Sequence, residues 1–197
     1  MKKVMMIAAM ALMSVGAFAQ EAGKMGLGLN ANYGIDSDYK NFGLGAKFQY
    51  SITDAFRAEV SGDYFFKKDY VSMWDANVNA HYVIKLSDNI NLYPLVGFTV
   101  MGVKFDYSDD IENEIEMAAK EAGMSVSDYK KLAKQYGYDL SEYEDEASDT
   151  ETKVGFNAGA GIEFFLSDSF KINAEFKYQY VKDFDRPVIS IGAAYVF

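Results

Sequence analysis

The sequence predicts an all-β protein, an eight-stranded antiparallel up-and-down β-barrel that crosses a membrane. Three observations predict this fold class. Apolar and polar residues alternate with period two over eight segments, as in strands that have two different faces. The chain is 16% aromatic with 16 Gly but only 2 Pro, which favours strands over helices. The connections between the segments alternate between short and long.

The N-terminus predicts export from the cytoplasm. Lys2 and Lys3 precede an apolar run, and Ala17 and Ala19 form a small-residue cleavage signal before Gln20. We therefore expect a cleaved signal peptide over 1–19 and a mature barrel domain over 20–197. A transmembrane anchor is the alternative, but the apolar run is shorter than the roughly 20 residues that span a bilayer.

Eight segments carry the strand pattern. The clearest one alternates Phe170, Ile172 and Phe176 on one face with Lys171 and Glu175 on the other. An even number of antiparallel strands places both ends of the chain on the same side of the membrane. The predicted strands are 25–35, 41–52, 56–67, 74–86, 90–105, 152–166, 170–180 and 187–197.

The predicted connections between strands are short at one end of the barrel and longer at the other. Tight turns at 51–54, 86–89 and 166–169 close one end. The other end carries 36–40, 68–71, 182–186 and the long segment 107–151. Short periplasmic turns and longer outer loops are typical of outer-membrane barrels.

The apolar face of the strands is predicted to face lipid. Its aromatic residues lie near strand ends, and Ala, Val, Leu and Ile lie toward the middle, as in membrane girdles. A soluble, lipocalin-like barrel would bury this face instead; the export signal and the sorted loops favour the membrane. The aromatic residues at strand ends are Phe42, Tyr64, Trp74, Tyr180 and Phe197.

The opposite face would then form a charged lumen. Its five acids and five bases balance, and buried charges need partners because an unpaired ion away from water is costly. Eight strands leave room for little more than side chains. The pattern favours a salt-bridged plug over a narrow ion path. The network residues are Lys47, Arg57, Glu59, Asp63, Asp75, Lys85, Glu163, Lys171, Glu175 and Lys177.

The fifth segment is irregular. Pro94 would remove a ladder hydrogen bond, which a position near the rim or a bulge would relieve. The alternation also breaks near Gly102 and Val103, which predicts a β-bulge there.

The last strand carries the most specific motif. Ser190, Gly192, Tyr195 and the terminal Phe197 resemble the C-terminal assembly signal of outer-membrane barrels. With this motif, residues 23–197 resemble the outer-membrane β-barrel family of OmpX, OmpW and the OmpA barrel domain. The resemblance implies a monomer in the outer membrane of a Gram-negative cell. It also implies that lipid, lipopolysaccharide and the barrel assembly machinery are its partners.

The insertion at 107–151 departs from that family. From Asp106 to Glu151 there are 15 acidic residues and four Lys, a net charge of −11. Apolar residues recur at helical spacing in two stretches, the first ended by Gly123 and the second begun by Ser125 or Ser127. We expect two short packed helices that present an acidic surface to an extracellular partner or a divalent cation such as Ca²⁺. No EF-hand spacing is present.

Several classes of function are excluded or disfavoured. The absence of Cys excludes disulfides, thiol chemistry and a lipid anchor on Cys. The net charge of −10 argues against nucleic acid as a partner. Barrel enzymes that modify lipid A use a His with a nearby Ser, which the single His81 lacks, so we expect no catalysis, cofactor or metal. A structural, surface-interaction protein is the favoured function, and a narrow pore or small-solute transporter is the alternative.

Overall fold

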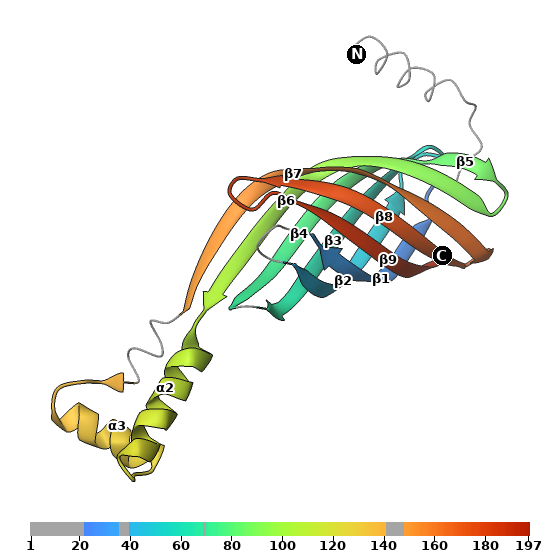
Figure 1. Cartoon of the computed structure of the whole chain (residues 1–197). Helices are drawn as coiled ribbons and strands as arrows, with labels where there is room; N and C mark the ends of the chain where they lie inside the picture. Colours follow the sequence, from blue (N-terminus) through green and yellow to red (C-terminus); the bar gives the residue numbers. More distant parts are fainter. Residues whose placement is uncertain (1–21, 36–39, 69, 141–147) are drawn as a thin grey trace.

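The computed structural model describes residues 22–35, 40–68, 70–140 and 148–197 and shows a closed antiparallel barrel with a helical extension (Figure 1). The predicted signal peptide over 1–19 and its cleavage residues Ala17, Ala19 and Gln20 lie outside the described residues.

Consecutive strands pair antiparallel around the barrel, except β4 and β5, and β1 pairs with β9. An additional pairing between β4 and β6 closes the sheet, as predicted for an eight-stranded up-and-down barrel. The strands are β1 (Met25–Gly34), β2 (Asn41–Ser51), β3 (Phe56–Lys68), β4 (Val71–Tyr82), β5 (Ile84–Ser87), β6 (Ile90–Asp106), β7 (Ser148–Ser167), β8 (Phe170–Val181) and β9 (Arg186–Val196).

The strands β4 and β5 are one crossing with a local interruption at Val83. The pairs His81–Leu95 and Ile84–Leu92 belong to the same register along β6, so Pro94 lies opposite the end of β4. Proline has no N–H to donate to the neighbouring strand, which accounts for the break. The Val83 N–H faces the other neighbour and donates to Ala55 O at 2.7 Å, which continues the register of β3 with β4.

The bulge predicted near Gly102 and Val103 is wrong. Strand β6 keeps one register with β4 and with β7 through this region. The side chains of Met101 and Val103 point inward and are fully buried. The alternation appeared to break because the inward face itself becomes apolar at this end of the barrel.

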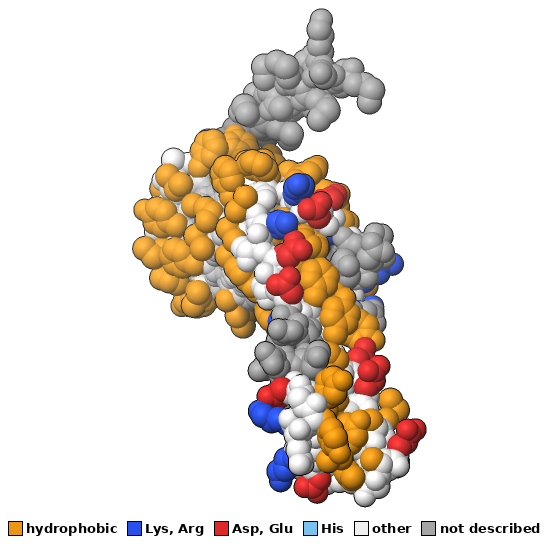
Figure 2. Space-filling view, turned by 90° about the vertical axis from the view of Figure 1, so that its left-hand side faces the viewer, with side chains coloured by type: hydrophobic (Ala, Val, Ile, Leu, Met, Phe, Trp, Pro, Cys, Tyr) orange, Lys and Arg blue, Asp and Glu red, His pale blue; other side chains and the backbone are white. Residues whose placement is uncertain are grey.

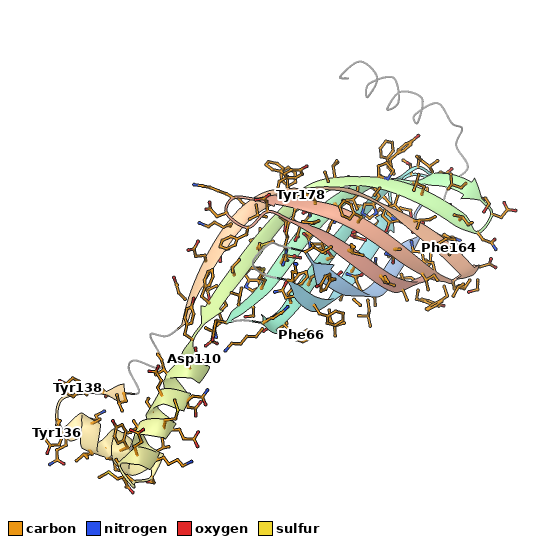
Figure 3. The ribbon with its side chains drawn as sticks, viewed as in Figure 1. Phe66, Asp110, Tyr136, Tyr138, Phe164 and Tyr178 are labelled. Atoms are coloured by element: carbon orange, nitrogen blue, oxygen red, sulfur yellow. The ribbon has the colours of Figure 1, made fainter. Side chains whose placement is uncertain are left out.

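The outer wall is apolar, as predicted. Leu29 is 71% exposed and Ile191 66% exposed, and the aromatic residues predicted at the strand ends also face outward. Figure 2 shows hydrophobic side chains covering the barrel wall, and Figure 3 shows Phe66 and Phe164 near opposite ends of that wall. This arrangement is the reverse of a soluble barrel and suits a lipid surround.

The predicted helices in the long loop are confirmed. Helix α2 (Ser108–Glu121) continues directly from β6, and α3 (Val126–Gln135) folds back beside it. Gly123 and Gly137 end the two helices with φ of 68° and 90°, conformations that favour glycine. The Ser125 hydroxyl caps α3 by accepting from the Asp128 N–H at 3.2 Å. Neither helix is long and apolar enough to cross a bilayer.

Candidate functional site

The barrel interior gathers the charged residues of six strands, β2, β3, β4, β7, β8 and β9, into one network. Nine of the ten predicted lumen charges are buried and point inward. They are Lys47 on β2; Arg57, Glu59 and Asp63 on β3; Asp75 on β4; Glu163 on β7; and Lys171, Glu175 and Lys177 on β8.

The structure corrects the predicted network at two positions. Lys85 lies at the rim, where its side chain is 32% exposed and its Nζ is 3.5 Å from Asp88 Oδ1. Lys85 pairs with the buried Asn91 and so keeps its inward parity, but it lies at the end of the strand, where solvent reaches its side chain. Arg186, which the sequence placed in a loop, is fully buried at the start of β9. The exchange keeps five buried acids and five buried bases.

The inner cluster lies near the short-turn end of the barrel. Arg57 Nη1 donates to both carboxylate oxygens of Glu163 at 3.0 and 2.8 Å. Lys171 Nζ contacts the same carboxylate at 2.8 Å, and Asn91 Nδ2 donates to it at 3.0 Å. One buried carboxylate thus joins residues of four strands, which offsets the cost of removing these charges from water.

The next layer contains His81. Arg57 donates from Nε and Nη2 to His81 Nδ1 at 3.2 and 3.1 Å, and the imidazole stacks on Tyr93 with ring centroids 4.8 Å apart. The Tyr93 hydroxyl donates to Glu175 Oε2 at 3.0 Å. The other imidazole nitrogen, Nε2, lies 3.7 Å from Glu59 Oε1 and makes no hydrogen bond within the described residues.

Glu59, His81 and Glu175 together resemble a metal-ligand set. One possible ligand atom from each lies within 4.8 Å of the others. A guanidinium only donates, so Nδ1 must accept and the neutral imidazole carries its proton on Nε2. Nε2 then offers no lone pair to a metal, and Lys47 and Arg57 already balance nearby carboxylates. These residues therefore do not fit a resident metal ion.

The outer polar layer centres on two carboxylates. Asn32 and Asn30 donate to Asp63 Oδ1 at 2.6 and 3.0 Å. Asp75 accepts from Gln179 Nε2 at 2.9 Å and forms an ion pair with Arg186 at 3.4 Å. Carboxamide side chains connect the charged pairs and fill the space between them.

An apolar cluster lies inside the barrel beyond this layer. Arg186 forms the boundary, with its guanidinium carbon 4.0 Å from the centroid of the Phe65 ring. The members of the cluster are buried, with at most 8% of a side chain exposed, and they come from five strands and the β8–β9 turn. We call it the apolar cap, and its members are Phe65, Val71, Met73, Met101, Val103, Val181, Phe184 and Val188.

Three of the four motif residues lie in β9 and Phe197 follows it directly, and the four divide between the two faces of the strand. Ser190 is buried and points into the lumen, whereas Tyr195 and Phe197 are exposed on the outer wall with their rings stacked 6.2 Å apart. Gly192 pairs with Asn30 of β1, and its missing side chain leaves room for Asn173 Oδ1.

The helical hairpin separates its charges. Helix α2 carries six acidic residues and one Lys, whereas α3 carries Lys130, Lys131 and Lys134 against a single Asp. Only Ile115 and Ala119 are buried among its described side chains. Tyr136 and Tyr138 are exposed directly after α3, at the left of Figure 3. The acidic loop therefore presents an acidic helix beside a basic one.

A closed barrel with an apolar wall, a paired polar interior and short turns at one end defines an integral outer-membrane protein. The chain belongs to the family described as "Outer membrane protein beta-barrel domain", which matches residues 5–197. No curated protein matches the chain at a significant level.

Solved structures share this fold at low sequence identity. The N-terminal β-barrel domain of Pseudomonas aeruginosa OprF is 13% identical with a TM-score of 0.62, covering 90% of this chain and 100% of that domain. Ail, the attachment invasion locus protein of Yersinia pestis, is 18% identical with a TM-score of 0.54, covering 89% and 99%. OprG of P. aeruginosa is 13% identical with a TM-score of 0.56, covering 91% and 98%.

Proposed function

We propose that this protein is a non-enzymatic, non-conducting barrel that displays a helical hairpin at the cell surface. In this proposal residues 1–19 direct export and are removed, and the terminal Phe197 of β9 is recognised by the barrel assembly machinery. The mature chain acts as a monomer, and its function is to interact with molecules outside the cell.

The filled interior is the observation that supports a closed lumen. Ten buried charges have partners within the lumen, and the apolar cap lies beyond them. An ion crossing this barrel would have to break the Arg57–Glu163 pair and then lose its hydration among apolar side chains. Both steps are costly in a medium of low polarity.

Single-channel conductance of the refolded mature protein in a planar bilayer tests the closed lumen. We expect no steady openings from protein whose folding is shown by its altered mobility on unheated gels. Reproducible openings would instead support the narrow pore or small-solute transporter.

The hairpin supports the interaction role. It projects from the barrel, and most of its side chains are exposed (Figure 1). Its acidic helix offers oxygen ligands through which divalent cations would bridge to lipopolysaccharide. Its basic helix suits an anionic polymer, and Ail, which shares the fold, has been crystallised with the heparin analogue sucrose octasulfate.

Deletion of residues 109–149 tests this role. Cells producing the deleted protein should assemble the barrel normally but lose adhesion to heparin-coated surfaces. A matched variant with Lys130, Lys131 and Lys134 changed to Gln would separate the basic helix from the rest of the loop. Unchanged adhesion in the deletion would rule out the hairpin as the interaction element.

A further inference from the structure

The helical hairpin leaves the apolar residues of its second helix open to solvent. Helix α3 and its C-terminal cap carry an apolar stripe at helical spacing, formed by Val126, Tyr129, Leu132, Ala133 and Tyr136. None of the ten residues of α3 is buried, and Tyr136 is 75% exposed. The stripe is therefore only partly covered by α2.

Helix α2 leaves apolar surface open as well. Ile115 and Ala119 are buried, but Met117 is 60% exposed, and Met124 in the turn to α3 is 43% exposed. A helix with a broad apolar stripe usually packs against two neighbours, as in a four-helix bundle. Each helix of the hairpin has one helical neighbour among the described residues. Two more helices would complete the packing.

The charges on the hairpin indicate which partner would supply these helices. Helix α2 has a net charge of −5 and α3 a net charge of +2. In Figure 2 hydrophobic side chains run along the middle of the hairpin, and the Lys side chains in view lie at its left edge. A matching partner offers apolar side chains, a basic surface for α2 and an acidic surface for α3. A second copy of the hairpin meets all three requirements.

A two-fold axis brings the complementary surfaces together. In a two-fold dimer the same patch is used on both copies, so α2 of each copy lies beside α3 of the other. The apolar stripes then share one core, and acidic and basic helices alternate around the bundle. An anionic lipid surface fits less well, because its headgroups would be repelled by α2.

We propose that the hairpins of two copies held in separate membranes pair to form a four-helix bundle. The hairpin projects beyond the rim of the barrel, so it can meet a hairpin from a facing membrane (Figure 1). Each barrel remains a closed monomer in its own membrane, and the protein links the two surfaces by binding itself. The pairing rests on the proposed display of the hairpin at the cell surface and makes a second copy of the chain one of its partners.

The first test uses the purified mature protein, with one copy in each nanodisc of neutral lipid, followed by analytical ultracentrifugation. We expect pairs of discs to form as the protein concentration rises. Tyr136→Asp places a charge in the apolar stripe, so the dissociation constant should rise by about tenfold or more. Gln135→Asp adds the same charge one position away, outside the stripe, and is the matched control.

Exchanging charges tests the pairing between unlike helices. In one variant the lysines of α3 are replaced, so both helices are acidic; in the other, three acids of α2 are replaced, so neither helix is acidic. Each variant alone should lose pairing by about tenfold or more, whereas mixing the two should restore most of it. The first variant is Lys130→Glu, Lys131→Glu and Lys134→Glu, and the second is Glu112→Lys, Glu114→Lys and Glu116→Lys.

Several results would overturn the proposal. Discs that stay single at all concentrations, or equal association by the Tyr136→Asp and Gln135→Asp variants, would each do so. Pairing that survives deletion of residues 109–149 would mean that the barrel or the disc causes it. Binding of the discs to protein-free vesicles of the same lipid would assign the apolar stripe to a membrane instead.

Adhesion to heparin is a separate result. Tyr136→Asp leaves the lysines of α3 in place, so this variant should retain adhesion to heparin while it loses self-pairing. Loss of heparin adhesion in the Lys→Gln variant, with self-pairing absent in every form of the protein, would support the proposed function and reject the four-helix bundle.

Discussion

The lumen and the hairpin are both rich in charge, but they use it in opposite ways. In the lumen, ten charged side chains are buried and paired across the barrel, so each holds several strands in position. In the hairpin the charges are exposed, and ion pairs such as Lys131–Asp128 at 3.7 Å stay within one helix. Buried, paired charges therefore hold the lumen together, whereas exposed charges leave the hairpin available for contacts. Four substitutions test this contrast.

The largest loss should follow Arg57→Met. The substitution leaves the Glu163 carboxylate buried without one of its two cationic partners. Breaking a buried ion pair typically costs about 3–5 kcal/mol in the free energy of unfolding. Urea unfolding in lipid vesicles, followed by the fluorescence of the single Trp74, measures the loss in free energy of unfolding. The control is Lys67→Met, whose partly exposed pair with Asp106 should be worth about 1 kcal/mol or less. Similar losses in the two variants would contradict a special role for the interior.

A smaller loss in the free energy of unfolding is expected when a side chain of the apolar cap is truncated. Met101→Ala leaves a void between enclosed side chains, and we expect about 2–3 kcal/mol, in the lower part of the range for buried Met→Ala. Its neighbour Val100 faces the lipid side, so Val100→Ala should cost clearly less in the same urea assay. Equal costs would mean that the cap is loosely packed.

Helix capping should affect the hairpin alone. Ser125→Ala removes the cap of α3 and should destabilise that helix by about 1 kcal/mol without changing the barrel. Hydrogen exchange should accelerate over residues 126–135, while the urea midpoint stays constant. Ser127→Ala, which lies inside the helix, is the control. A shift in the barrel midpoint would show that the two regions are coupled.

The smallest effect should come from Lys131→Ala. Its pair with Asp128 is exposed, so the change in stability should stay within about 0.5 kcal/mol. The same hydrogen-exchange experiment measures it. A loss as large as that of Arg57→Met would refute the contrast between the regions.

The alternation of residue types was enough to predict the barrel and nine of the buried charges. The prediction failed where the inward face becomes apolar, as at Met101 and Val103. Alternation records which residues are polar, and it indicates which way a side chain points only while the inward face stays polar. Arg186 lies two residues before the inward-facing Val188, so the same alternation predicts that Arg186 also points inward. It was not predicted because the sequence before Pro187 is typical of a loop and the predicted strand began at residue 187. Lys85 keeps the predicted inward parity but lies at the rim beside the β5–β6 turn, and alternation does not separate an exposed rim position from a buried one. The helices were predictable because their stop and cap signals are local.

The hydrogen bonds and ion pairs in the lumen also affect how the barrel forms. Arg57 and Glu163 lie 106 positions apart in the chain, and Lys47 and Asn173 lie 126 apart. A half-assembled sheet cannot bring such partners together, so its inward charges remain hydrated until the last strands meet. Closure and dehydration should then occur in one late step. Once that step is complete, reopening requires many distant contacts to fail together, which predicts slow unfolding and long residence in the membrane.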